Sequence, residues 1–319
     1  MKKIFFVLII LIFINENFAQ ACCTAGTPLL NSLEMSSAKK GILSFGLTGK
    51  YNLLTDVYDN SNFLENQERK RISNSYLLEI TYGFTSRLSL SMLLSYVNNT
   101  RKITTINNLE NTIMVSGIGD ALLLQKYNII NADLFNRTEL SAGIGIKLPL
   151  GSSTRTDRSI LLPADMQPGT GSIDGLLWLY FSQGNLLIPE ITFLANSSYR
   201  FNGRNKRFGN KQDGYKFGNE FIFTSGFTFS TNSFINFTLL ARFRNAGADK
   251  FGNQKIPNTG GNWLYLFPGL NFKLSDKLTT GISGEIPLYT NVIGTQLTTT
   301  FTASLSVYYS VRIIKGLEL

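Results

Sequence analysis

The sequence predicts an all-β fold, a transmembrane antiparallel up-and-down β-barrel of about twelve strands. Three observations predict it. Two-faced segments recur along the chain, the connections between them alternate in length, and no later stretch approaches the ~18 to 20 apolar residues of a membrane helix. The clearest segment, Tyr215 to Ser230, carries aromatic rings at odd positions and mostly polar or small residues at even ones. A regular alternation of this length exceeds most strands of soluble proteins.

The first residues have the layout of a secretory signal. Lys2 and Lys3 precede the apolar run Ile4 to Ile14, and Ala19-Gln20-Ala21 offers small residues for cleavage. The run is too short to span a bilayer. We therefore expect a signal peptide over residues 1–21, a periplasmic N-terminal segment over 22–41 and the barrel over 42–319.

The strands follow from alternation bounded by turn residues. In chain order they are expected over Ile42 to Leu54, Asn74 to Phe84, Leu88 to Asn98, Ile113 to Ile129, Thr138 to Leu150, Gly171 to Phe181, Ile188 to Phe201, Tyr215 to Ser230, Phe234 to Asn245, Gly261 to Leu274, Leu278 to Thr290 and Thr298 to Ile314. The alternation is weakest in the strand from Gly171, where Leu176 and Leu177 are adjacent.

The connections alternate between five short turns and six longer loops. Short turns such as Thr85 to Arg87 and Ser275 to Lys277 are separated by loops such as Thr55 to Ser73, Gly151 to Thr170 and Asn202 to Gly214. Outer-membrane barrels combine short periplasmic turns with long external loops and an even strand count. The pattern therefore predicts twelve strands in the bacterial outer membrane, with both termini in the periplasm. A soluble β-sandwich is the alternative, but its strands are shorter and its loops need not alternate in length.

The apolar phase of each strand predicts which side chains face lipid and which face the lumen. Most strand charges fall on the inner face, because a Lys or Arg facing lipid at mid-depth costs roughly 2–4 kcal/mol. Two interpretations remain open: the charges line a water-filled path, or they pair across a narrow barrel and neutralise one another. The candidates for the lumen or for transport are Asp120, Lys147, Asp174, Lys216, Glu220, Arg242, Arg244, Glu285 and Arg312.

Two details of the inner face bear on function. Arg242 and Arg244 are neighbouring inward positions on one strand, which makes them the stronger functional candidates. Trp263, Tyr265 and Phe267 also fall on the inner face, where they either line or plug the lumen, or else belong to an interfacial girdle.

Composition excludes several function classes. The chain has no histidine, which rules out Ser-His-Asp and Cys-His catalysis and the commonest metal ligand, so we predict no enzyme activity and no cofactor. The formal net charge is +9, but Lys and Arg are scattered, and no basic cluster with stacking aromatics predicts nucleic-acid binding. The predicted partners are outer-membrane lipid and a small-molecule solute.

Four motifs in the middle of the chain exceed what strand alternation requires. They are Gly117 to Ala121, Lys126-Tyr127, Gly145 to Gly151, and Pro168 to Ser172 followed by Asp174. These motifs resemble a family of bacterial outer-membrane barrels assigned to transport in the meta-pathway of phenol degradation. The resemblance implies an outer-membrane channel for hydrophobic or aromatic compounds. Asp120 and Lys147 lie on consecutive strands with both side chains inward, so they are expected to pair, and the Pro-Gly-Thr-Gly run reads as a loop re-entering a strand.

Cys22 and Cys23 are the only cysteines and lie at the expected mature N-terminus, so the barrel carries no disulfide framework. Three interpretations of the pair remain: no specific role, thiol or soft-metal chemistry, or lipidation of Cys22.

The function expected from these observations is an outer-membrane channel or transporter for passive passage of small solutes. The alternative is a structural or adhesive barrel that acts through its extracellular loops.

Overall fold

The computed structural model describes residues 20–21, 39–66, 68–104, 109–132, 137–185, 188–208, 213–231 and 234–313. Cys22, Cys23 and most of the expected signal peptide and N-terminal segment lie outside these ranges. The wall of the molecule consists of β2 (Ile42–Asp59), β4 (Arg69–Gly83), β5 (Leu88–Thr104), β6 (Glu110–Ile130), β7 (Thr138–Leu148), β10 (Asp174–Gly184), β11 (Ile191–Phe201), β13 (Glu220–Ser230), β14 (Ile235–Ala246), β17 (Gly261–Lys273), β18 (Leu278–Val292) and β19 (Thr295–Arg312).

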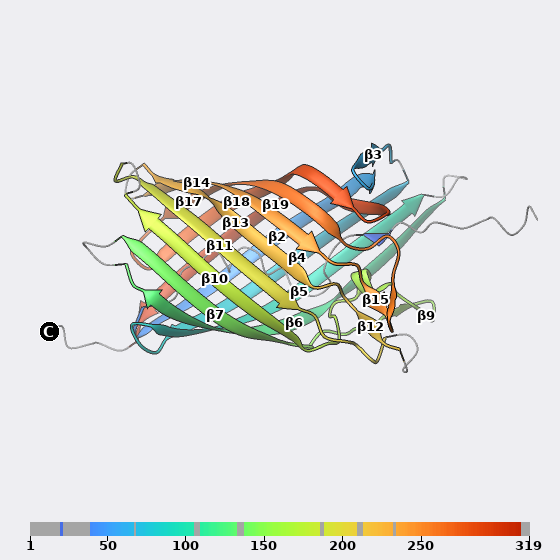
Figure 1. Ribbon diagram of the computed structural model, residues 1–319, viewed down its shortest axis with the longest axis horizontal. Helices are drawn as coiled ribbons and strands as arrows, with labels where there is room; N and C mark the ends of the chain where they lie inside the picture. The colour runs from blue at the N-terminus through green and yellow to red at the C-terminus, as the bar shows by residue number, and fades with distance from the viewer. Residues whose placement is uncertain are drawn as a thin grey trace, which may run out of the picture.

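These strands form one closed antiparallel barrel, as the sequence predicted (Figure 1). Each wall strand pairs with its sequence neighbours, and β19 pairs with β2 from Thr295–Asp59 to Arg312–Ile42, which closes the sheet. The topology is therefore up-and-down, with every long edge of the wall paired. Among the described residues, no helix is long and apolar enough to cross a membrane.

The outer face is apolar along the middle of the strands. On β19, Phe301, Leu305 and Val307 are exposed outward, while Thr302 and Ser304 between them are buried inward. Similar alternation on the other strands gives an oily band around the barrel, the surface that a bilayer covers. The chain is thus an outer-membrane-type β-barrel, and its localisation is the bacterial outer membrane.

Shorter elements lie beyond the wall strands. They are β1 (Gln20–Ala21), which pairs in parallel with β19, β3 (Asn62–Leu64), which folds back and pairs antiparallel with the end of β2, the hairpin of β8 (Thr156–Asp157) and β9 (Ile160–Leu161), the short 3-10 helix η2 (Ala164–Met166), and the small sheet of β12 (Tyr215–Lys216), β15 (Lys250–Phe251) and β16 (Gln254–Lys255).

The expected start of the aromatic strand over Tyr215 to Ser230 is wrong. β13 begins at Glu220, and Tyr215 and Phe217 belong instead to a buried cluster at the extracellular end, with Ala164 and the partly buried Phe208 and Phe251. The alternation is real, but its first two rings pack on neighbouring loops rather than on lipid. Only the part from Phe221 to Phe229 is in the wall strand.

A buried hydrogen-bonded pair supports that extracellular cluster. The Tyr215 hydroxyl donates to Asp249 Oδ2 at 2.5 Å, and the Gly218 amide donates to Asp249 Oδ1 at 2.8 Å. Burial raises the pKa of the Asp249 carboxyl above its ordinary value, although both hydrogen bonds act in the opposite direction. Burial and the neighbouring carboxylate likewise raise the pKa of the Tyr215 hydroxyl.

Candidate functional site

The inner face of the barrel brings charged side chains of neighbouring strands into ion pairs. The first group joins three strands, because Lys147 of β7 lies between Asp120 of β6 and Asp174 of β10. Lys147 Nζ is 2.6 Å from Asp120 Oδ2 and 2.8 Å from Asp174 Oδ2. All three side chains are at most 1% exposed. The pairing of Asp120 with Lys147 confirms the expectation from the sequence.

This ionic group also holds the long loop between β7 and β10. Asp120 accepts hydrogen bonds from the backbone amides of Gly151 and Thr170 and from the Thr170 hydroxyl, at 3.2, 2.9 and 2.8 Å. Asp174 Oδ1 accepts one from the amide of Gly203 at 2.8 Å, in the next long loop. Hydrogen bonds to an ionised carboxylate are among the stronger ones in proteins. Asp120 therefore fixes both ends of residues 149–173 to the barrel wall, and Asp174 adds a contact at the second end, where its Oδ1 accepts a hydrogen bond from the Ser172 hydroxyl at 2.7 Å.

Glycines let the loop approach the wall this closely. A Cβ atom at Gly169 would lie 2.5 Å from Asp120 Oδ1 and 2.6 Å from the backbone of Gly151. Gly171 has φ +70°, and a Cβ there would meet the Asn205 side chain at 2.2 Å. The Pro-Gly-Thr-Gly motif is thus explained by backbone packing against the Asp120 side chain.

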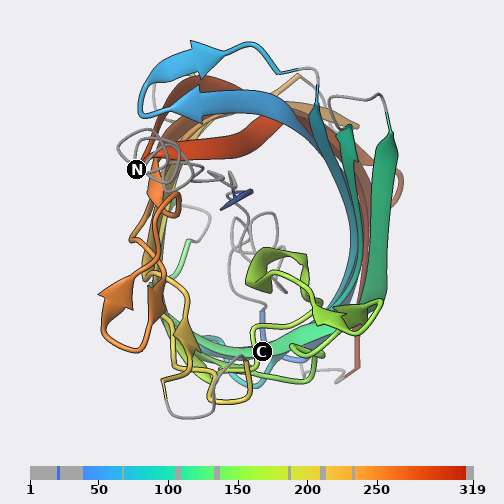
Figure 2. The same cartoon turned by 90° about the vertical axis from the view of Figure 1, so that its right-hand side faces the viewer.

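Between its two ends, the loop 149–173 folds into the barrel. Figure 2, which looks along the barrel, shows its yellow-green ribbon inside the ring of strands. Arg71 of β4 is 2% exposed and contacts Asp165 of η2 at 2.8 Å, and it also donates to the Asp165 carbonyl at 2.6 Å. Met166 is fully buried against Val115 and Leu162. The loop therefore lines and narrows the extracellular half of the lumen.

Two further ionic groups lie on the following strands of the wall. Glu220 of β13 lies between Arg200 of β11 at 2.5 Å and Arg244 of β14 at 2.7 Å. Glu285 of β18 lies between Arg242 of β14 at 3.0 Å and Lys50 of β2 at 3.3 Å. All of these side chains are largely buried.

The inward aromatics stack on the same cations. The guanidinium of Arg242 lies over the Phe267 ring at 4.7 Å, and that of Arg244 over the Trp263 ring at 4.6 Å. Trp263, Tyr265 and Phe267 are all buried on the inner face. Because Arg242 and Arg244 are both ion-paired and stacked, the geometry favours the second of the two interpretations, in which the charges of the lumen neutralise one another.

Two predicted site residues lie elsewhere. Lys216 is not on the barrel wall, because it belongs to β12 in the extracellular sheet. Arg312 is the last residue of β19 and is exposed at the periplasmic mouth, opposite Ile42. Cys22 and Cys23 lie outside the described residues.

Sequence reasoning missed Arg71 and Asp165, which hold η2 in place. Both fall in segments expected to be loops, where no alternation assigns a side chain to the lumen. The only available signal was the Gly-rich motif after Asp165, which indicated a re-entrant loop without naming its contacts.

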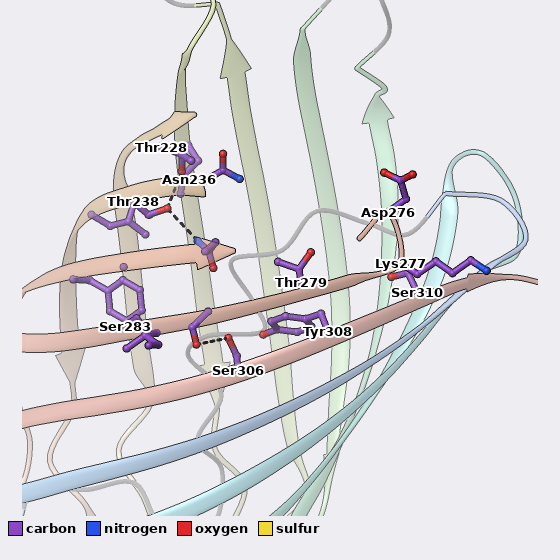
Figure 3. A pocket seen from close by; sticks show the side chains of 17 residues that line it. Thr228, Asn236, Thr238, Asp276, Lys277, Thr279, Ser283, Ser306, Tyr308 and Ser310 are labelled. Atoms are coloured by element: carbon purple, nitrogen blue, oxygen red, sulfur yellow. Dashed lines mark hydrogen bonds between the residues drawn. The ribbon is translucent and has the colours of Figure 1, made fainter. Parts of the chain in front are cut away.

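On the periplasmic side of the ionic groups, the inner wall from β13 to β19 lines a cavity of about 380 Å³, here called the vestibule (Figure 3). Its lining is mostly neutral, with hydroxyl and amide side chains along the wall and Leu194, Leu240 and Phe267 at the inner end. The charged lining residues are Asp276 and Lys277, in the turn at the periplasmic end. The hydroxyl and amide residues are Thr228, Asn236, Thr238, Asn271, Thr279, Ser283, Ser306, Tyr308 and Ser310.

Asp276 and Lys277 lie at the solvated rim of the vestibule rather than in its interior. The Asp276 side chain is 94% exposed and contacts Lys273 at 2.8 Å, which lowers its carboxyl pKa. In the part of the chain that the structure describes, no three His, Cys, Asp or Glu side chains gather where they could hold a metal ion.

Comparison with known proteins shows similarity of fold. No family model matches the chain, and no curated protein sequence does. A COG4313 outer membrane channel from Pseudomonas putida F1 superimposes with a TM-score of 0.70 at 14% identity, over 86% of this chain and 97% of that one. The transport unit of the autotransporter AIDA-I from Escherichia coli gives 0.47 at 11% identity, over 88% and 95%. The P. putida toluene transporter TodX gives 0.42 at 10%, over 88% and 94%.

The identities in these comparisons are too low to carry more than architecture. The resemblance to the phenol-degradation family therefore stays a prediction from the four motifs. The chain shares the closed outer-membrane β-barrel fold of the Pseudomonas channel.

Proposed function

We propose that this barrel is a passive outer-membrane channel for small uncharged solutes, with hydrophobic or aromatic molecules as the preferred class. The observation that carries the proposal is the vestibule. Its volume of about 380 Å³ falls in the range of small-molecule sites, roughly 300–1,000 Å³. It is lined by neutral hydroxyl and amide groups with an apolar inner end.

Electrostatics favour an uncharged solute. Taking a charged group out of water costs free energy unless a partner charge compensates it. The inward charges next to the vestibule, Arg242, Glu285 and Lys50, are already paired with one another, which leaves one net positive charge spread over the group. A charged solute would therefore gain little from the wall, whereas a neutral one finds hydroxyl groups and the Phe267 region to contact.

Two features support the hydrophobic or aromatic class. Leu194, Leu240 and Phe267 give the inner end of the vestibule an apolar surface on which a ring packs. The family resemblance of the Gly117 to Asp174 motifs implies the same class of compound. An aromatic alcohol suits this lining, because its ring can pack on the apolar inner end and its hydroxyl group can bond to the hydroxyl and amide side chains.

The test is solute entry into proteoliposomes. We expect faster swelling with glucose than with gluconate, and faster uptake of benzyl alcohol than of benzoate, relative to liposomes without protein. A folded barrel that gives neither conductance nor uptake would sink the proposal. A preference for the charged member of each pair would overturn the uncharged class while leaving the channel itself in place.

Variants connect the selectivity to the vestibule. Asn236 lines it, and Asn236→Arg places a new cation there, so we expect relative entry of gluconate to rise. Asn111→Arg, on the exposed extracellular end of β6, is the matched control and adds the same charge away from the cavity. Equal effects of both substitutions would mean that the vestibule does not select.

A further inference from the structure

The small extracellular sheet carries a row of three lysines. Lys216 of β12 pairs with Lys250 of β15, which in turn pairs with Lys255 of β16. Directly opposed residues in neighbouring strands project from the same face of a sheet, with strands ≈ 4.7–4.9 Å apart. The three ammonium groups therefore extend from one face, side by side.

The other face of this sheet is apolar and packs on the barrel. Tyr215 and Phe251 are opposed in the same register and contact the cluster that contains Ala164 and Phe217. Because Ala164 belongs to the loop that folds into the lumen, the apolar face of the sheet packs toward that loop. The lysine row looks away from that loop.

Among the described residues, the three lysines form no ion pair within 4 Å, and the ion pairs of this part of the chain involve other side chains. Lys250 and Lys255 are exposed, and Lys216 is half-buried. Like charges placed directly opposite one another in a sheet destabilise it. An anion bound across the row removes this repulsion, and phosphate oxygens suit ammonium donors.

The position of the row relative to the membrane identifies the source of the anion. Lys250 follows the last residue of β14, Ala246, by four positions, and Lys216 precedes Glu220 of β13 by four. Four extended residues span at most about 14 Å. The outward rings of Phe243 and Phe201 lie near those strand ends. The lysines thus lie within a headgroup's reach of the apolar band.

The views of the model agree with this placement. Figure 1 shows β12 and β15 at one end of the barrel, and in Figure 2 the orange hairpin of β15 and β16 lies outside the ring of strands rather than over the lumen. A site in this position faces the outer leaflet of the membrane, not the entering solute.

We propose that Lys216, Lys250 and Lys255 bind the phosphate groups of the phosphorylated glycolipid of the outer leaflet. The site anchors the extracellular loops to the membrane surface. It is independent of whatever passes through the lumen.

The experiment compares lipid binding by the full-length protein and its variants in detergent, by native mass spectrometry and by the shift in unfolding temperature. The probes are bisphosphorylated lipid A, lipid A with both phosphates removed, and inorganic phosphate. One cation beside an anionic lipid surface is worth roughly a fivefold change in affinity. We therefore expect K216Q/K250Q/K255Q to bind bisphosphorylated lipid A at least about tenfold more weakly than the unmodified protein.

The control triple variant, K39Q/K40Q/K277Q, removes the same charge from exposed periplasmic positions and is expected to bind normally. K216R/K250R/K255R keeps the charge and is expected to retain binding, which separates loss of charge from misfolding. Unchanged binding by K216Q/K250Q/K255Q, or equal loss in the periplasmic control, would overturn the site. Lysine-dependent binding of inorganic phosphate with no preference for lipid A would overturn the lipid assignment.

Discussion

At the residue scale, the lumen contains cations held between carboxylates or carboxylates held between cations. Lys147 is the clearest case, since its ammonium group contacts both Asp120 and Asp174 in a fully buried position. Breaking a buried ionic group by removing one partner leaves an uncompensated charge, which is far more costly than losing a surface pair.

Lys147→Met is therefore expected to destabilise the barrel by about 3–5 kcal/mol. Denaturant unfolding of protein folded in lipid bilayers measures the loss. Lys273→Met is the control, because it breaks the exposed Lys273–Asp276 pair, for which about 0–1 kcal/mol is expected. Equal losses of unfolding free energy in the two variants would show that the buried ionic group stabilises the barrel no more than the exposed pair does.

Asp249 gives a pH dependence of definite sign. Its pKa is raised in the folded cluster, so the folded state binds the proton more tightly than the unfolded state does. The stability that this group contributes is fully present below the unfolded pKa and is lost as pH rises through the folded pKa. We expect the protection of residues 215–218 against hydrogen exchange, corrected for intrinsic rates, to fall as the pH rises above about 4, the ordinary aspartate pKa.

Asp249→Asn is expected to remove that dependence, since the amide cannot ionise. Asn245→Asp, which adds a carboxyl on the exposed Asn245–Asn262 pair, controls for a general effect of charge on the same end of the barrel. A pH profile that persists in Asp249→Asn would assign the effect to another group.

At the element scale, the inward loop is attached at its ends by Asp120 and Asp174, through Gly151, Thr170 and Ser172, and at its middle by the Arg71–Asp165 pair. The two ends are covalently continuous with β7 and β10, so the middle contact decides whether η2 stays against β4. Loss of one partner of a buried charged hydrogen bond costs about 1–3 kcal/mol or more.

Asp165→Asn is expected to release η2 for part of the time and so raise mean single-channel conductance and its fluctuations. Asp157→Asn, in β8 of the same loop, removes an identical charge without touching Arg71, and is expected to leave conductance unchanged. Conductance traces of Asp165→Asn that match those of the unmodified protein would contradict a constricting role for the loop.

The sequence predicted the existence and order of the wall strands because apolar and polar side chains alternate along each strand. It placed some extracellular ends too early, as at Asn98, whereas β5 continues to Thr104. Above the lipid band, both faces of a strand meet water or loops, so the apolar phase that marks a strand disappears. The opposite error occurred at Tyr215. Its ring continues the apolar alternation of β13, so the strand was expected to include it, but the ring packs on a loop.

The sequence predicted most of the charged residues of the candidate site, but not which of them pair with one another. Inward charges follow from phase, but the partner of a side chain depends on register and on bulges such as the one between Leu94 and Tyr96. That is why Glu285 was expected in the lumen although its contacts with Arg242 and Lys50 were not. The Arg71–Asp165 pair depends on a loop path that no local pattern encodes.

At the scale of the whole molecule, the barrel has an apolar outer surface and a polar inner surface. The same substitution is therefore expected to affect stability differently on the two faces. Leu305 is 55% exposed on the outer face of β19, and Ser306 next to it lines the vestibule.

Leu305→Arg is expected to cost roughly 2–4 kcal/mol in bilayer unfolding experiments if its depth is near the midplane. Ser306→Arg faces the vestibule and is expected to change stability less while slowing benzyl alcohol entry. Heat-modifiable gel mobility checks that both variants close into barrels. A larger loss of stability for the inward arginine would reverse the assignment of faces.

The pairing of β2 with β19 has a further consequence for how the barrel is made. It joins Ile42 to Arg312, so it has the greatest sequence separation of any pairing between wall strands, whereas the loop's ionic group joins the consecutive strands β6, β7 and β10. Contacts between distant segments carry the larger loop-closure entropy and form late. We expect the loop 149–173 to dock onto an open sheet first, so that it already covers the inner face when β2 and β19 pair and close the barrel.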